Sequence, residues 1–166
     1  MNHPDGLRVQ PVPSVDIERY AGRWYEISHL PNRFQRQCSA ETTAEYSPRP
    51  DGRLTVVNRC RRADGTFEEV TGVARKRDKP PGGATFKVRF APGWLSFIPQ
   101  VWGDYWILAL PEDYRYAVVG EPSRKYLWIL SRTPRMSESD YAAAVEAAER
   151  NGYDTRHLVK TRQPVR

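Results

Sequence analysis

Two cysteines and three histidines are the residues in this chain best suited to metal, redox or proton-transfer chemistry. His3, His29 and His157 lie far apart, and no group of His, Cys and carboxylate residues has the spacing of a metal site. The sequence contains neither a Gly-x-Ser-x-Gly turn nor a phosphate-binding loop. We therefore expect a protein with no catalytic centre, no metal and no cofactor. A redox-active or catalytic protein is the least favoured class.

The two cysteines, Cys38 and Cys60, flank a predicted hairpin that turns at Asp51-Gly52. Both therefore fall at the same end of that hairpin, where a disulfide is within reach. A disulfide would suit an extracytoplasmic protein. Two buried free thiols are the alternative.

Short runs of alternating apolar and polar residues, separated by Pro, Gly and Asp-Gly turns, predict strands without intervening helices. This pattern predicts an all-β protein, an eight-stranded up-and-down antiparallel barrel. The predicted strands cover residues 23–29, 41–47, 53–61, 66–77, 85–90, 104–110, 115–121 and 125–132.

Helical signals occur only before the first strand and after the last. Asp16 is a suitable N-cap for a short helical turn that ends before Gly22. Residues 137–151 are rich in Ala and Glu and predict a helix on the outside of the barrel. Ser137 is its expected N-cap, Asp140 the reciprocal acid of a capping box, and Gly152 the stop signal. Its apolar stripe is Tyr141, Val145 and Ala148, and a short strand at 157–160 follows.

The length of 166 residues fits one domain, which we place at 15–166 behind an extended arm at 1–14. The net charge of +6 comes without a dense Lys/Arg block, so we expect a solvated basic surface and no nucleic-acid partner. No apolar run approaches the roughly 20 residues of a membrane span, and the N-terminus lacks the apolar region of a signal peptide. These features predict either a cytoplasmic protein or an envelope protein, periplasmic or outer-membrane associated, whose leader was removed.

Three short motifs add a family to this picture. Gly22-Arg23-Trp24-Tyr25 opens the first strand, Glu112-Asp113-Tyr114 precedes the seventh, and Leu130-Ser131-Arg132-Thr133-Pro134 ends the eighth. Their order and spacing resemble the three motifs of the lipocalin family, in particular the bacterial outer-membrane lipocalins and apolipoprotein D. The second motif departs from the family pattern, because Glu112 stands where many members have Thr. The resemblance implies that Arg132 packs over Trp24 and seals one end of the barrel, with Gly22, Asp113 and Tyr114 as scaffold.

Strand alternation predicts which side chains face the interior. Arg132 must point inward to meet Trp24, so counting back in twos places Trp128 and Tyr126 inside. The same counting on the other strands selects Ala44, Tyr46, Val56, Asn58, Val70, Gly72, Phe86, Val88, Phe90, Tyr105, Ile107, Ala109 and Val119. This interior is apolar and aromatic with few polar groups, which suits one small hydrophobic ligand. A barrel filled by its own side chains is the alternative.

The loops at the open end complete the predicted site. We expect Phe34, Trp94 and Phe97 to line it, and the apolar loop Trp94–Trp102 to cover the ligand, touch a membrane or form a homodimer contact. The family resemblance favours a fatty acid or lysophospholipid, with a role in maintaining envelope lipids. Basic residues near the same rim are expected to meet the headgroup: Arg33, Arg36, Arg75, Lys76 and Arg77. A membrane-surface or partner-binding module that acts through the apolar loop is the second function class.

Overall fold

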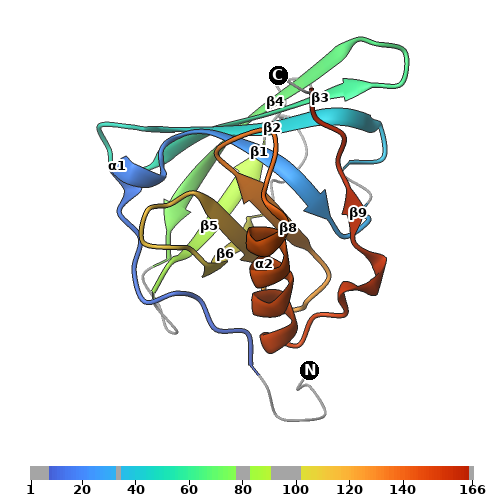
Figure 1. Cartoon of the computed structure of the whole chain (residues 1–166). Helices are drawn as coiled ribbons and strands as arrows, with labels where there is room; N and C mark the ends of the chain where they lie inside the picture. Colours follow the sequence, from blue (N-terminus) through green and yellow to red (C-terminus); the bar gives the residue numbers. More distant parts are fainter. Residues whose placement is uncertain (1–7, 33–34, 78–82, 91–101, 165–166) are drawn as a thin grey trace.

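The computed structural model describes residues 8–32, 35–77, 83–90 and 102–164, and forms a closed antiparallel barrel (Figure 1). Its strands are β1 (Gly22–His29), β2 (Cys38–Pro48), β3 (Leu54–Arg62), β4 (Phe67–Lys76), β5 (Thr85–Phe90), β6 (Gly103–Ala109), β7 (Tyr116–Gly120) and β8 (Leu127–Ser131). Consecutive strands pair from β2 to β8, and β1 pairs with both β8 and β2 and so closes the barrel. The predicted fold class is confirmed.

The helices lie where the sequence places them. α1 (Ile17–Tyr20) precedes β1, and the Asp16 carboxylate accepts from two amides of this helical turn. α2 (Glu138–Arg150) packs on the outside of the barrel, and Ser137 caps its first turn (Figure 1). The expected capping box is wrong, because both carboxylate oxygens of Asp140 accept from the Arg115 guanidinium at 2.9 and 3.0 Å.

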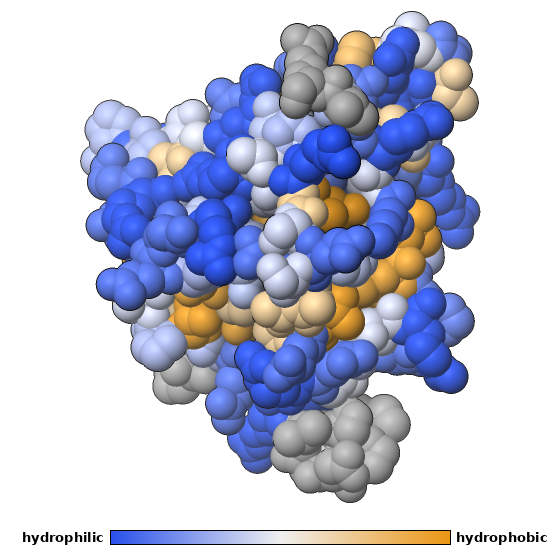
Figure 2. Space-filling view, in the orientation of Figure 1, coloured by the Kyte–Doolittle hydropathy of each residue, from blue (hydrophilic) through white to orange (hydrophobic). Residues whose placement is uncertain are grey.

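Two apolar clusters divide the buried residues between the inside and the outside of the sheet. The inner cluster contains Trp24, Tyr46, Val56, Phe86 and Ile107 among others. The outer cluster joins β6, β7 and β8 to α2, which buries Ala144, Ala147 and Ala148. On the face seen in Figure 2, hydrophilic residues predominate and apolar residues show only in patches between them. The sheet that forms the barrel wall therefore lies between the two clusters.

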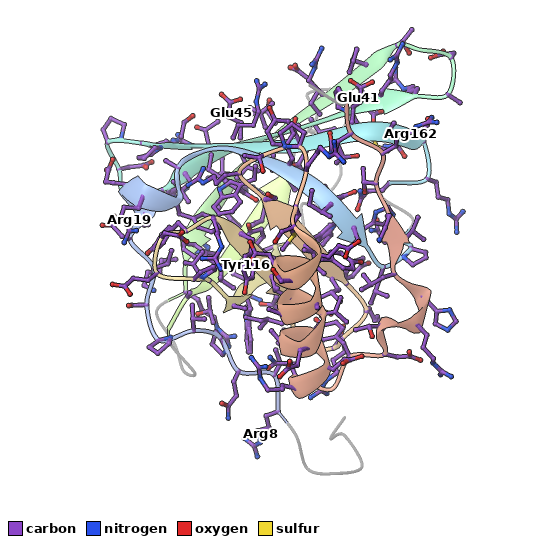
Figure 3. The ribbon with its side chains drawn as sticks, viewed as in Figure 1. Arg8, Arg19, Glu41, Glu45, Tyr116 and Arg162 are labelled. Atoms are coloured by element: carbon purple, nitrogen blue, oxygen red, sulfur yellow. A yellow bond between two sulfur atoms is a disulfide. The ribbon has the colours of Figure 1, made fainter. Side chains whose placement is uncertain are left out.

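A segment near the C-terminus completes the seam between β1 and β2. The two strands pair from Gly22 to Tyr25 only, and beyond this point a segment that we call the tail, residues 159–163, lies between them. The Thr161 amide donates to the Ile27 carbonyl at 2.8 Å, and the Glu41 amide donates to the Arg162 carbonyl at 2.7 Å. Figure 3 shows Glu41 and Arg162 close together at this seam.

The tail differs in detail from the predicted strand at 157–160. Only Val159–Lys160 (β9) is a strand, because Thr155–His157 (η3) forms a 3-10 turn capped by the Asp154 side chain.

The described part of the N-terminal arm, residues 8–14, lies along the barrel. The Val12 amide donates to the Ile107 carbonyl at 2.8 Å, and the Ala84 amide donates to the Val12 carbonyl at 2.9 Å. Val9 is buried in the outer cluster. The arm thus contributes to the packing of β5 and β6.

Candidate ligand-binding lumen

One end of the barrel is closed by Trp24, which is fully buried. The Arg132 guanidinium lies 3.9 Å from the centre of the indole ring and donates to the carbonyls of Ala21, at 2.9 Å, and Arg19. The indole N–H donates to the Tyr20 carbonyl at 2.8 Å. A cation over an aromatic face with its N–H groups bonded to carbonyls gives a rigid plug. We call this the closed end, and the opposite end the mouth.

The other motif residues support the closed end. Gly22 has a φ of +101°, and a Cβ there would lie 3.3 Å from Nη1 of Arg132, which favours glycine. The Tyr114 hydroxyl accepts from the Asp16 amide at 2.8 Å and so ties α1 to the β6–β7 turn. Asp113 forms an exposed ion pair with Arg115.

Three tyrosine hydroxyls meet above the plug. Tyr105 shares hydrogen bonds of 2.7 Å with both Tyr20 and Tyr46. Burial raises the pKa of Tyr46 to about 12 and raises the pKa values of Tyr20 and Tyr105 well above the ordinary range. These neutral phenols satisfy one another and form the floor of the lumen.

Most of the predicted wall residues lie together on the inner face. The inner cluster contains, buried or half-buried, Ala44, Tyr46, Val56, Phe86, Val88, Tyr105, Ile107, Val119 and Trp128. Strand register places Asn58 opposite Ala44 and Val70 opposite Asn58, so these two share that face. Gly72 and Phe90 pair nearer the mouth, where Phe90 is 37% exposed. Tyr126 stacks on Trp128 with ring centres 5.8 Å apart.

Three predicted site residues, Phe34, Trp94 and Phe97, lie outside the described residues, as does Arg33. Arg36 is described and exposed.

Two expectations about the lumen are wrong. Ala109 belongs to the outer cluster, because a bulge in β6 pairs it with the outward-facing Val118. Arg75, Lys76 and Arg77 lie towards the closed end. β4 begins at the mouth, and its last residue, Lys76, pairs with Phe86 of β5, which contacts Tyr105 of the floor. Lys76 donates to the Gly83 carbonyl at 2.6 Å, and Arg75 lies on the outer wall against Trp102. These basic residues do not line the mouth.

A buried polar cluster on β1 was missed in the sequence. Glu26 is 3% exposed, pairs with Leu130 of the inner cluster, and accepts from Gln35 Nε2 at 2.8 Å and from the Thr161 hydroxyl. Its carboxylate also lies 3.0 Å from Nδ1 of His29. Counting forward in twos from Trp24 would have found Glu26. The same count wrongly puts His29 outside, because a regular count in twos ignores the bulge between Glu26 and Ser28.

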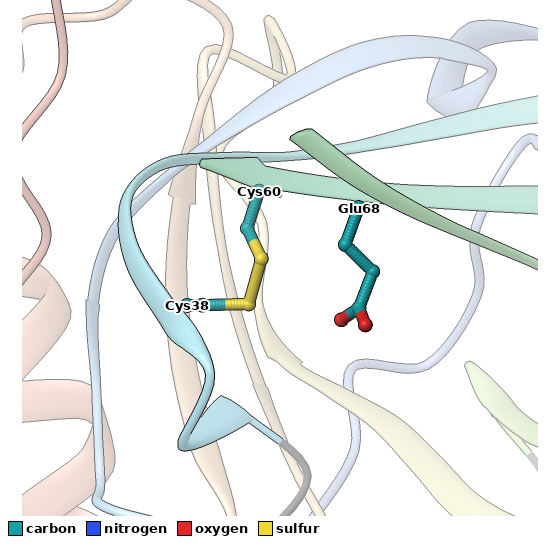
Figure 4. Close-up of side chains that lie close together, drawn as sticks. All are labelled: Cys38, Cys60 and Glu68. Carbon is teal, nitrogen blue, oxygen red and sulfur yellow. A yellow bond between two sulfur atoms is a disulfide. The ribbon is translucent and has the colours of Figure 1, made fainter. Parts of the chain in front are cut away.

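At the mouth, Cys38 and Cys60 form a disulfide, as expected (Figure 4). Glu68 lies beside them, and these three are the cluster of possible metal ligands found in the described residues. Both sulfur atoms are in the disulfide and so are not thiolate ligands. Glu68 is bound by Gln37 and Arg62, and the hydrogen bond from Gln37 is the main cause that lowers its pKa. We assign this cluster a structural role.

The family model of a lipocalin-like domain matches residues 15–163. The chain belongs to the lipocalin family. This lipocalin is 45% identical over 153 residues to temperature-induced lipocalin-1 of Arabidopsis thaliana, covering 92% of this chain and 81% of the relative. It is 38% identical to the outer membrane lipoprotein Blc of Escherichia coli K12, over 97% and 85% of the two chains. It is 31% identical to mouse apolipoprotein D, over 90% and 78%.

Solved structures confirm the fold. Insecticyanin of the tobacco hornworm Manduca sexta superposes with a TM-score of 0.75 at 22% identity, over 94% of this lipocalin and 85% of that chain. Lipocalins bind small hydrophobic ligands, and the inner face of this barrel has the apolar character that such binding needs. None of the described helices has the length and apolar character to cross a membrane.

Proposed function

We propose that this lipocalin binds a fatty acid or lysophospholipid in its lumen and carries it within a cell envelope as part of lipid maintenance. One observation carries the proposal. The inner face is apolar from the tyrosine floor to Phe90, and among the described residues Glu26 is a buried carboxylate on it with His29 beside it, while the strand register puts Glu68, paired with Arg62, on the same face at the mouth. An acyl chain needs such a wall, and a polar headgroup needs one polar place beside it.

Two further observations support this assignment. The Escherichia coli relative is named an outer membrane lipoprotein, and it matches nearly the whole of this chain. The Cys38–Cys60 disulfide is typical of proteins outside the reducing cytoplasm. Neither names the lipid.

The test compares two substitutions on neighbouring residues of β3. Val56 is buried in the inner cluster, whereas Val57 faces the other side of the strand. Val56→Trp should fill the lumen and abolish calorimetric binding of a fatty acid and a lysophospholipid, while Val57→Trp should bind as the unmodified protein does. Equal binding by both variants would place the ligand elsewhere. Mass spectrometry of organic extracts of the purified protein then identifies what it carries.

A second candidate is contact with an anionic membrane surface. On the outer wall, the centre of the Trp102 ring lies 4.3 Å from the guanidinium group of Arg75 and 4.7 Å from that of Arg89. Cationic side chains beside an aromatic ring suit a membrane interface. Co-sedimentation with anionic but not zwitterionic vesicles, lost in Arg75→Gln/Arg89→Gln, would support it.

A further inference from the structure

The polar cluster in the lumen joins three parts of the chain. Glu26 and His29 come from β1, Gln35 from the segment after it, and Trp128 from β8. Glu26 pairs with Leu130 and His29 with Trp128, and both partners belong to the inner cluster. Because directly opposite residues share a face, both polar side chains face the lumen. The bulge between Glu26 and Ser28 is what puts two residues three apart on the same face.

Hydrogen bonds fix the orientation of the histidine. An ionised carboxylate can only accept, so beside an ionised Glu26 the Nδ1 that lies 3.0 Å away carries the proton. Gln35 holds the other carboxylate oxygen through Nε2 and, through Oε1, accepts from the Trp128 indole at 2.7 Å. Glu26 thus holds the imidazole ring of His29 in place, and Gln35 links the Glu26 carboxylate to the indole of Trp128.

The second ring nitrogen of His29 is left for another partner. Within the described residues, Nε2 makes no hydrogen bond, and the side chain is 18% exposed whereas that of Glu26 is 4% exposed. When the imidazole is protonated, Nε2–H is a charged donor whose ring is held by a carboxylate behind it. Such a donor recognises a carboxylate or phosphate oxygen.

The position also suits the anionic end of an acyl ligand. Trp128 and the stacked Tyr126 supply an apolar surface beside His29. Arg75, Lys76 and Arg77, three of the residues expected to meet the headgroup, lie away from the mouth. Resting on the proposed lipid binding, we propose that His29, positioned by Glu26, binds the anionic group of the ligand and does so when its imidazole is protonated.

In the described part of the chain, few other charged side chains lie beside His29. β8 presents Trp128 to it, and β9 and the tail present Val159 and Thr161, none of which titrates in the physiological range. Lys160 lies instead over the ring of Tyr141 on α2, at 4.9 Å. Among the described residues, Glu26 is the charged group in contact with His29. Ligand affinity should therefore follow the protonation of this one histidine.

The test measures binding of three ligands with the same alkyl chain by calorimetry, below their micelle concentrations. Dodecanoate carries a carboxylate, dodecylphosphocholine a phosphate, and dodecanol no charge. Histidine side chains change charge between about pH 5 and 8, so the measurements are made at about pH 6 and about pH 8. We expect dodecanoate, dodecylphosphocholine or both to bind more tightly at the lower pH, and dodecanol to bind equally at both. The ligand that shows the effect identifies the headgroup.

Variants assign the effect to His29. At the lower pH, His29→Gln should weaken binding of the anionic ligand by about tenfold or more, the worth of a charge-assisted hydrogen bond, and leave dodecanol unchanged. His29→Lys keeps the charge and should restore tight binding with no dependence on pH. His157→Gln, which removes an exposed histidine of η3, is the matched control and should behave as the unmodified protein.

The outcomes separate this inference from the function on which it rests. If none of the three ligands binds to the unmodified protein, the proposed function fails. If all bind and His29→Gln leaves the ratio of anionic to neutral affinity unchanged, the headgroup assignment alone is overturned.

Discussion

Phe90 and Gly72 interlock across the β4–β5 pair near the mouth. A Cβ built on Gly72 would lie 2.6 Å from Cδ1 of Phe90 and 2.5 Å from the Arg89 carbonyl oxygen. Glycine is therefore required here by close approach, since Gly72 has no positive φ. This contact holds an aromatic ring at the entrance, where a ligand must pass.

The first prediction concerns this contact. Gly72→Ala should lower the free energy of unfolding by about 1–3 kcal/mol, because the added methyl group overpacks against main chain as well as a side chain. Gly103→Ala is the control, since a Cβ there meets only the Val88 carbonyl at 3.8 Å. Urea denaturation followed by circular dichroism measures both. Equal losses in the two variants would contradict the close approach.

The second prediction concerns the plug. Arg132→Lys should lower the free energy of unfolding by about 1–3 kcal/mol, because a single ammonium group cannot both cover the Trp24 face and bond two carbonyls. Arg23→Lys, which affects an exposed pair with Glu45, should cost under about 1 kcal/mol. Ligand affinity should be unchanged in both, since the plug lies below the tyrosine floor. A marked loss of affinity in Arg132→Lys would mean that the plug contacts the ligand.

The third prediction is a dependence of stability on pH from the tyrosine floor. The folded-state pKa of Tyr46 is raised to about 12, and those of Tyr20 and Tyr105 are raised as well, by burial. An unfolded tyrosine titrates near pH 10, so above this pH the folded state holds more protons than the unfolded state. The stability is fully present below about pH 10 and should fall as pH rises towards about 12. Urea midpoints across this range measure the slope, which Tyr46→Phe should reduce.

Much of the fold could be predicted from the sequence, because its signals are local. Asp16, Ser137 and the Asp51-Gly52 turn act on their near neighbours, and Cys38 and Cys60 could be paired once that turn was known. Strand period located most of the inner face.

The rest depended on features that have no local signal. The bulges that turn His29 inward and Ala109 outward add one residue to a strand, which reverses every later side chain. Residue type does not show at which end of the barrel Arg75 lies. That follows only from the direction in which its strand, β4, runs. The tail is mostly polar, and nothing in it predicts insertion between two distant strands.

The fourth prediction tests that insertion. The side-chain Nε2 of Gln163 donates to the backbone carbonyl of Glu26 at 2.7 Å and to that of Thr42 at 2.8 Å, one on each side of the seam. Gln163→Ala should lower the free energy of unfolding by about 1–3 kcal/mol and speed hydrogen exchange at the Glu41 and Thr161 amides, because two carbonyls lose their donor. Gln10→Ala, an exposed glutamine of the arm, should change neither. Unchanged exchange in Gln163→Ala would show that the seam does not depend on this side chain.

The seam also sets the order in which the barrel can be completed. β1 and β2 emerge first, yet the wall between them is completed by residues 159–163, which are synthesised after every other strand. Until then a nascent chain keeps part of two strand edges unpaired and the Glu26 cluster without its Thr161 donor. Completion of the barrel therefore waits for residues 159–163 to dock between β1 and β2.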